Sequence, residues 1–231
     1  MRILTPLLLS AFLTLGLGTA GFAGDTRGTI TVTGSSTITV VPDLATISLG
    51  VTTNGTTAAA AMSANSDALA AVMTRLKATG IDDRDMQTSN LSINPNWVTN
   101  AAGTASEIHG YIANNMLTVR IKAIGTTGTV LDAAVSDGAN TLNGLTFGLL
   151  DQRPTEDQAR KQAVADALAR ANLLAAASGA KLGPILSIAE ADGLQPQPYQ
   201  TFSKSDAAAV PVAAGEVGIT ASVTIVFQIG E

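Results

Sequence analysis

The sequence predicts an α+β protein in which helices pack on an antiparallel or mixed sheet, with one protruding β-hairpin. Period-two alternation of apolar and small polar residues recurs along the chain, and it is typical of strands that bury one face. Three other stretches place apolar or alanine residues at helical spacing. Two alternating stretches flank a loop of small residues, which predicts the hairpin.

The first elements are expected to be strands. Ile30 and Val32 alternate with threonines, and the same pattern returns at residues 38–40. After a turn at Pro42, residues 45–51 alternate again and predict a longer strand. From residue 57 to residue 79 the period becomes helical, and Gly80 stands where a helix commonly ends.

The hairpin is predicted from residues 91–97 and 116–123, with a small, uncharged loop between its strands. Pro95 cannot donate a backbone hydrogen bond, so the first of these strands is expected at a sheet edge or beside a bulge. Trp97 is the only tryptophan in the chain. A pair of long strands with an open edge is a natural site for sheet extension between chains. The alternative is a monomer whose hairpin folds back over the core.

Two more helices are expected. The first spans about residues 127–136 and precedes a strand at 142–149. The second begins near Pro154, where Thr155 and Gln158 have the spacing of a capping box, and ends at Gly179. Its outer face should carry ion pairs at i,i+4, and its inner face alanines that allow close packing. The pairs are Glu156/Arg160, Asp157/Lys161 and Asp166/Arg170, and the inner residues are Ala159, Ala163, Ala167 and Leu174.

The C-terminal part is expected to hold a strand around residues 185–188, an irregular loop at 193–215 and a final strand at 219–229. The loop is crowded with Pro, Gln, Ser and Ala and lacks periodicity. The final strand has the cleanest alternation in the chain, so it is expected to return to the sheet. The loop is therefore interpreted as an insertion within a single domain of residues 24–231.

Residues 1–23 have the layout of a secretory signal peptide. Arg2 precedes an apolar run, and the small side chains at Gly21 and Ala23 suit cleavage near Ala23. The run is short for a transmembrane helix and is interrupted by Gly and Thr. We therefore expect export to the periplasm without an integral membrane span, and association with the outer membrane is left open.

The composition excludes several classes of function. The chain has no cysteine, which excludes disulfides, cysteine-ligated metals and a lipid anchor on cysteine. The formal net charge is −5 and no basic run occurs, so nucleic acid is not an expected partner.

No residue constellation predicts a catalytic, cofactor or metal site. His109 is the only histidine, and no Gly-x-Ser-x-Gly motif is present that could pair with it. Asp82, Asp83 and Asp85 are close in sequence, but they lack the pattern of a calcium loop. We interpret them as a solvated turn between a helix and a strand. The prediction is accordingly a protein that is not an enzyme and carries no cofactor.

Short motifs in a fixed order resemble the SIMPL domain family of bacterial periplasmic proteins, which includes immunogenic and outer-membrane antigens. They run from Ile30-Thr31-Val32-Thr33-Gly34 and Val40-Val41-Pro42-Asp43-Leu44-Ala45 through Gly80-Ile81, Gln87-Thr88, Ile93-x-Pro95, Gly110-Tyr111-x-Ala113-x-Asn115, Gly138-Ala139-Asn140 and Ala180-x-Leu182-Gly183 to Ala221-Ser222-Val223-Thr224-Ile225. The resemblance implies export, an α+β fold and self-association. It implies no enzyme activity and supplies no catalytic residues.

Two functions follow as hypotheses. The first is a self-associating, non-enzymatic protein of the cell envelope that acts as a scaffold or a stress-protective factor, with a homo-oligomer as the expected assembly. The second is a binding module that holds a peptide, a glycan or a small molecule through the Trp97 hairpin or the loop of residues 195–212.

Overall fold

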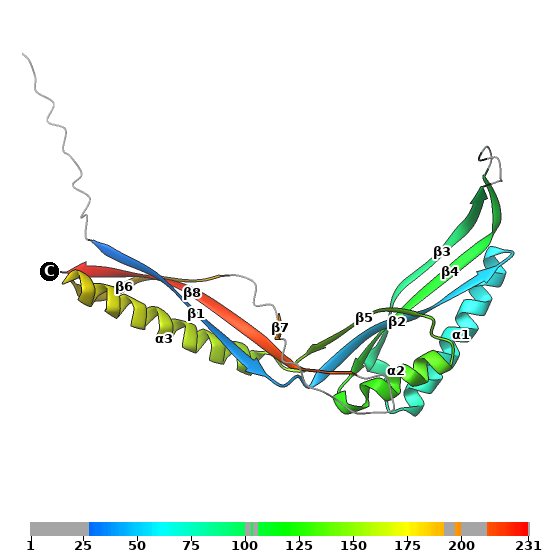
Figure 1. Ribbon diagram of the computed structural model, residues 1–231, viewed down its shortest axis with the longest axis horizontal. Coiled ribbons are helices and arrows are strands. Elements are labelled where there is room, and N and C mark those ends of the chain that lie inside the picture. The colour runs from blue at the N-terminus through cyan, green and yellow to red at the C-terminus, as the bar shows by residue number, and fades with distance from the viewer. Residues whose placement is uncertain (1–27, 100–102, 104–105, 192–196, 200–211, 231) are drawn as a thin grey trace, which may run out of the picture.

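The computed structural model describes residues 28–99, 103, 106–191, 197–199 and 212–230. In these residues the chain forms two antiparallel sheets with helices on one face of each, which confirms the predicted α+β class. The two sheets lie at opposite ends of an elongated molecule (Figure 1). Each sheet has its own hydrophobic core.

The first sheet places the long C-terminal strand β8 at its centre, between β1 and β6, and the short β7 pairs beside the start of β8. Its elements are β1 (Thr29–Val40), α3 (Arg153–Ser178), β6 (Lys181–Glu190), β7 (Gln197–Tyr199) and β8 (Glu216–Gly230). Strand β8 pairs with β1 without a break, from Thr29 opposite Gln228 to Val40 opposite Val217. The prediction that the final strand returns to a sheet is therefore confirmed.

Helix α3 covers one face of the first sheet (Figure 1). It buries an alanine at every fourth position, at residues 159, 163, 167, 171 and 175, against Val32, Val223, Ile225 and Phe227. Threonines of β1 occupy the opposite face, as the alternation requires. The predicted alanine face is thus confirmed, except that Leu174 is about half exposed.

Two details of α3 differ from the prediction. The helix begins at Arg153, so Thr155 lies inside its first turn and the predicted capping box does not form. The backbone N–H of Arg153 instead donates to the carboxylate of Asp151. The pairs of Arg160 with Glu156 and of Arg170 with Asp166 are present, but Asp157 pairs with Arg160 rather than with Lys161. Arg160 reaches both acidic residues because they lie three and four positions before it on the helix.

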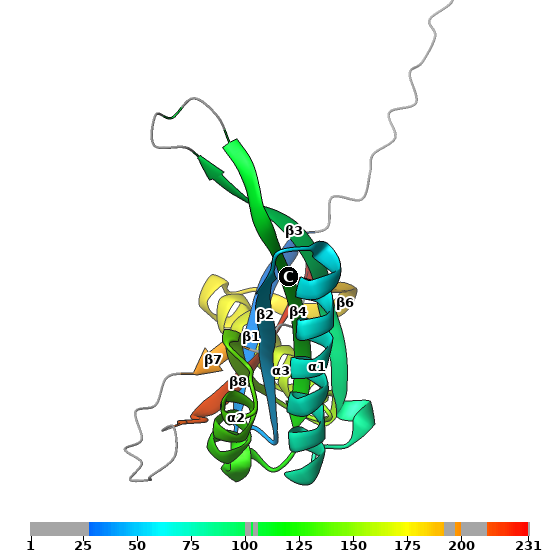
Figure 2. The same cartoon turned by 90° about the vertical axis from the view of Figure 1, so that its right-hand side faces the viewer.

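The second sheet has the strand order β3-β4-β2-β5. Its elements are β2 (Leu44–Gly55), α1 (Ala58–Ala78), the short 3₁₀ turn at Asp83–Asp85, β3 (Met86–Thr99), β4 (Ser106–Ile121), a second 3₁₀ turn at Ile124–Thr126, α2 (Thr127–Ser136) and β5 (Thr141–Gly148). Helices α1 and α2 cover one face (Figures 1 and 2). The alternating residues of β2 and β4 are buried beneath them with Leu69, Val72 and Leu76 of α1.

The chain passes between the sheets through the β1–β2 link and the β5–α3 link, and Asp43 ties these two links together. The backbone N–H of Asp43 donates to the carbonyl of Gly148 over 3.1 Å. Its carboxylate accepts a 2.6 Å hydrogen bond from the backbone N–H of Leu150. The junction is therefore held by hydrogen bonds at the place where the chain crosses.

Two predicted segments lie wholly or largely outside the described residues. The signal peptide of residues 1–23 is one of them, and the loop of residues 193–215 is the other. Of that loop, the structure describes β7 and the irregular residues 212–215 that lead into β8. The single-domain organisation of residues 24–231 stays a prediction.

Candidate functional site: the projecting hairpin of β3 and β4

Strands β3 and β4 form a long antiparallel hairpin that extends beyond α1 (Figures 1 and 2). Their pairing runs from Met86 opposite Val119 to Thr99 opposite Ser106. The outer part is exposed along both strands, whereas β4 becomes buried from Gly110 onward. The hairpin therefore projects from the sheet, as predicted, and does not fold back over the core. The predicted second strand, residues 116–123, is misplaced: residues 116–119 pair with the start of β3 in the buried part of the sheet, and the exposed outer part of β4 is residues 106–109.

Strand β3 is an edge of the second sheet, because it pairs with β4 alone. Pro95 lies in this strand opposite Tyr111, and the register shifts between Asn96 and Trp97. Both parts of the expectation for Pro95, an edge and a bulge, are confirmed. The backbone groups of β3 that point away from β4 have no strand partner in the part of the chain that the structure describes.

Strand β3 and the outer part of β4 expose large apolar side chains. Trp97 is 59% exposed and Leu91 is 55% exposed, and Ile93, Val98 and Ile108 are exposed as well. Trp97 lies directly opposite Ile108 across the two strands. A single exposed apolar residue is ordinary, but a group of them on one element is typical of an interaction surface.

A cavity of about 350 Å³ opens at the base of the hairpin. Its side-chain lining is polar and contains no carboxylate, ammonium or guanidinium group, and it consists of Asn54, Thr56, Asn96, His109 and Tyr111, with Gly55 and Gly110 between them. Gly110 has φ of +150°, and a Cβ atom there would lie 2.8 Å from the carbonyl oxygen of Gly55. Glycine is therefore required at this contact of β4 with the end of β2.

The three aspartates near the start of β3 have different surroundings. Asp82 pairs with Arg84, and Asp83 pairs with Lys77, on the exposed turn that was predicted. Asp85 does not fit that prediction, because it is buried and forms an ion pair with Lys122, with Arg120 4.0 Å away. Each carboxylate thus has a cationic partner in the fold.

The residues considered for catalysis are not brought together. His109 lies on the exposed part of the hairpin, whereas the aspartates lie at the other end of β3. Among the described residues, no group of three or more His, Asp or Glu side chains is arranged to hold a metal ion. None of the helices in these ranges is both long and apolar enough to cross a bilayer. The absence of a catalytic or cofactor site stays a prediction.

Sequence reasoning located the hairpin but missed some of the side chains that make its surface apolar. The exposure of Val98 and Ile108 is not predictable from the sequence, because alternation alone does not show which strand ends extend beyond the cover of a helix. The small-residue loop between the strands was the available signal that the hairpin would project.

The sequence is similar to those of several bacterial proteins. A 26 kDa periplasmic immunogenic protein of Brucella melitensis is 38% identical over 212 residues, which cover 87% of this chain and 84% of that protein. The YggE protein of Escherichia coli K12, described as uncharacterized, is 28% identical over 207 residues, covering 87% of this chain and 82% of YggE. The model of the SIMPL family, described as a protein of unknown function (DUF541), matches residues 30–227. The match spans both sheets and the hairpin, and the chain belongs to the SIMPL family.

Proposed function

We propose that this protein is a non-enzymatic, self-associating protein of the bacterial periplasm, and that it assembles through the β3–β4 hairpin into a scaffold or stress-protective particle. The observation that carries the proposal is the free edge of β3 together with the exposed apolar side chains around Trp97. Both features belong to one element that projects from the rest of the molecule.

Sheet extension supplies the physical reason for assembly. An unpaired edge strand presents a row of backbone donors and acceptors to another strand. Proteins that stay monomeric commonly protect such edges with charged side chains, prolines or bulges. Pro95 and two bulges interrupt β3, one just before Asn90 and one after Asn96, whereas residues 90–94 have neither. Strand β3 has no charged residue between Met86 and Thr99. A second copy can therefore add a strand to this edge and cover Leu91, Ile93 and Trp97 from water.

The periplasmic location is supported by the name of the Brucella relative and by the layout of residues 1–23. Cleavage near Ala23 gives a mature chain that begins near Gly24. The non-enzymatic role is supported by the separation of His109 from the aspartates of the Asp83–Asp85 turn.

Sedimentation of the mature protein tests the assembly. We expect the wild type to sediment as an oligomer and Trp97→Asp to shift toward the monomer, because a carboxylate must be desolvated at the interface. Leu173→Asp is the matched control, since Leu173 is 70% exposed on α3 and far from the hairpin. A monomeric wild type, or equal sedimentation of wild type and Trp97→Asp, contradicts the proposal.

Sedimentation and complementation of one variant, His109→Ala, together separate this function from an enzymatic one. We expect His109→Ala to sediment as the wild type does. We also expect it to complement a deletion strain, that is, to restore the wild-type phenotype. A folded His109→Ala variant that assembles but does not complement contradicts the non-enzymatic role.

The second candidate function is a binding module, and the cavity beside His109 is the observation that favours it. Its asparagine and tyrosine side chains offer both donors and acceptors to a small polar ligand or a glycan. Loss of ligand binding in Asn96→Ala, with unchanged sedimentation, would assign the hairpin to binding rather than to assembly.

A further inference from the structure

The chain contains two Asn-Gly dipeptides, Asn54-Gly55 and Asn143-Gly144. Glycine has no side chain to hinder its backbone nitrogen, so this nitrogen can attack the side-chain amide carbon of the asparagine before it. The attack requires the two atoms to approach within about 3–3.5 Å in a suitable orientation. Because a regular ladder holds the backbone of a strand extended, the fold decides which of the two dipeptides reacts.

Asn143 lies at a bulge in strand β5. Gly144 is opposite Ser48 of β2 and Leu142 is opposite Leu49, so Asn143 between them has no residue opposite to it. An extra residue of this kind is left unpaired and disrupts the ladder locally. Strand β5 pairs with β2 alone, so no second strand restrains its outer side within the described ranges. The backbone at Asn143 is therefore restrained less than that of a regular strand.

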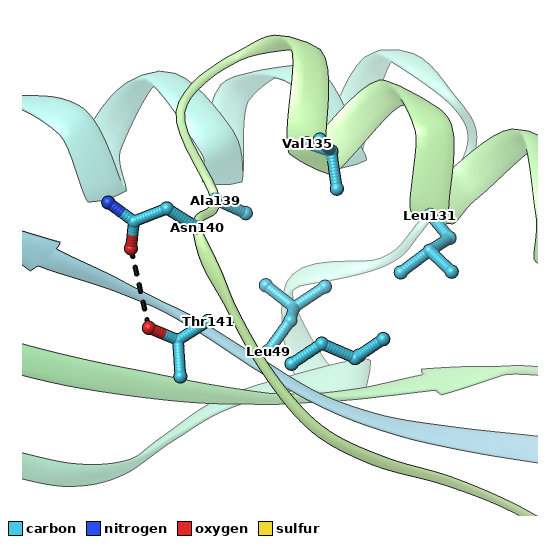
Figure 3. Close-up of a pocket in the computed structure, with 7 residues that line it drawn as sticks. Leu49, Leu131, Val135, Ala139, Asn140 and Thr141 are labelled. Atoms are coloured by element: carbon cyan, nitrogen blue, oxygen red, sulfur yellow. Dashed lines mark hydrogen bonds between the residues drawn. The ribbon is translucent and has the colours of Figure 1, made fainter.

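Hydrogen bonds at the start of β5 keep the bulge at this position. The amide oxygen of Asn140 accepts from the backbone N–H of Thr52 over 2.7 Å, and its amide nitrogen donates to the carbonyl of Thr52 over 2.8 Å. Figure 3 shows the hydrogen bond from the hydroxyl of Thr141 to the same amide oxygen. From Gly144 onward the strand pairs regularly with β2. The extra residue therefore stays at Asn143.

The residues around the bulge have little packing against them. Leu142, Asn143 and Gly144 are all exposed. Leu142 lies at the rim of an apolar groove between α2 and β5, a cavity of about 200 Å³ that opens beside the strand (Figure 3). A Cβ atom on Gly144 would meet no other atom within 4 Å. Few buried contacts are typical of a segment that opens easily, so the reacting atoms have room to approach.

The same dipeptide at the end of β2 is held in place by its neighbours. Asn54 is also exposed, so access to water does not distinguish the two sites. However, Asn54 and Gly55 lie in regular register opposite Ile112 and Tyr111 of β4. A Cβ atom on Gly55 would lie 2.4 Å from the backbone nitrogen of Ala61 in α1. The backbone of Gly55 is thus enclosed between a strand and a helix and cannot turn toward the Asn54 side chain.

We propose that Asn143 is a site of spontaneous deamidation in the folded protein. The backbone nitrogen of Gly144 bonds to Cγ of Asn143 and loses its proton, and the side-chain amide nitrogen leaves as ammonia, which gives a cyclic succinimide. One water molecule then opens the ring at either carbonyl and yields aspartate or isoaspartate. The reaction requires no oxidant, reductant or enzyme. The site is separate from the hairpin, so it does not depend on the assembly proposed above.

The product changes the free edge of the second sheet. Strand β5 carries no charged residue, and deamidation places a carboxylate on it. A charged side chain on a free strand edge opposes pairing with another strand. The amide nitrogen of Asn143 donates to Sδ of Met116 over 3.8 Å, and this contact is lost because an ionised carboxylate has no donor. In isoaspartate the main chain also gains one carbon atom, which displaces the register of β5.

Incubation of the folded, mature protein at neutral pH tests the proposal. Peptide mass spectrometry should show replacement of the side-chain NH₂ by OH at Asn143, and an isoaspartyl methyltransferase should methylate the same peptide. Asn54 should react about tenfold more slowly, or more slowly still, because its dipeptide cannot reach the required geometry. In urea the two rates should become similar, because unfolding removes the restraint on Asn54.

Two glycine variants of the same strand complete the test. Gly144→Ala should fold, because the added methyl group meets no other atom, and it should slow the reaction at Asn143 about tenfold by hindering the nitrogen. Gly148→Ala is the matched control, since a Cβ atom there also lies in open space and the residue does not follow an asparagine. Its rate at Asn143 should equal that of the wild type. The proposal is overturned if Asn143 keeps its amide in the folded protein, if Asn54 reacts equally fast there, or if Gly144→Ala reacts as fast as the wild type.

Discussion

Asn65 shows how a single polar side chain joins a helix to two strands. It is fully buried in α1, and its amide nitrogen donates to the carbonyls of Val51 in β2 and Ala113 in β4, over 2.8 and 3.1 Å. The sequence places Asn65 on the apolar face of the helix, where a polar residue is unexpected. Only the tertiary structure explains it, because the acceptors come from strands distant in sequence.

Asp166 has a similar role on the outer side of α3. One of its carboxylate oxygens accepts from the backbone N–H of Ser35, on the free edge of β1, over 2.9 Å. The same oxygen lies 2.9 Å from Nε of Arg170. The hydrogen bond from Ser35, followed by the hydrogen bond from Arg170, lowers the pKa of Asp166 below its usual value of 3.8. The carboxylate thus covers part of a free strand edge.

This lowered pKa predicts a dependence of stability on pH. The charged form of Asp166 stabilises the folded state fully above pH 3.8, and this contribution is lost as the pH falls through the lower pKa of the folded protein. We expect Asp166→Asn to be less stable than the wild type at neutral pH, and the difference to shrink below pH 3.8. Urea denaturation at a series of pH values measures it. A difference that does not change with pH would contradict the role of the charge.

At the scale of the elements, the contact between α3 and β1 depends on the absence of side chains on both partners. The helix contributes alanines at every fourth position, and the strand contributes Gly34. A Cβ atom on Gly34 would lie 2.1 Å from the carbonyl oxygen of Ala163 and 2.4 Å from the backbone nitrogen of Ala167. Backbone atoms cannot rotate away as a side chain can, so the helix itself would have to move.

Gly34→Ala is therefore expected to lower the free energy of unfolding by about 1–3 kcal/mol through overpacking. Gly144→Ala is the matched control, because Gly144 is also a strand glycine, but a Cβ atom there would meet no other atom within 4 Å. Alanine there should be neutral or slightly stabilising. Urea denaturation of both variants measures the difference. Equal stabilities would show that α3 is not held close to β1.

At the scale of the whole molecule, two separate cores are connected through a short junction. The core of the first sheet is built largely from alanines of α3, and the core of the second from larger residues of α1, β2 and β4. The C-terminal strand β8 completes the sheet begun by β1, so the first sheet is formed from both ends of the described chain, whereas the second sheet is formed by the continuous stretch of residues 44–148 between them. The hydrogen bonds of Asp43 hold the two crossings side by side.

We expect this arrangement to unfold in one cooperative transition. Leu76→Ala removes a buried side chain from the core of the second sheet, and Phe227→Ala removes one from the core of the first. Each should cost about 2–5 kcal/mol and lower the same calorimetric transition. Two resolved transitions, each moved by only one of the variants, would contradict the prediction of a single domain.

Local patterns were sufficient to predict most of the elements and the projecting hairpin. Alternation in β2 and β8 identified their buried faces, and Pro95 identified an edge strand, because each depends on residues within one segment. The apolar groove between α2 and β5 was not predictable in this way. Its lining comes from β2, α2 and β5, and nothing in these segments taken singly shows that a cavity remains between them.

Backbone geometry imposes periods of two and about 3.6 on buried residues, and for this reason the amino-acid pattern is enough to predict the α+β class, the alanine face of α3 and the positions of most strands. The tertiary structure alone decided that the strands divide into two sheets, that Asp85 is buried beside Lys122, and that Thr155 does not cap α3. The first two depend on which distant segments meet, and the third depends on the residue at which the helix begins, which a periodic pattern does not fix. A periodic pattern shows which face of an element is buried, but it does not show which partner buries it.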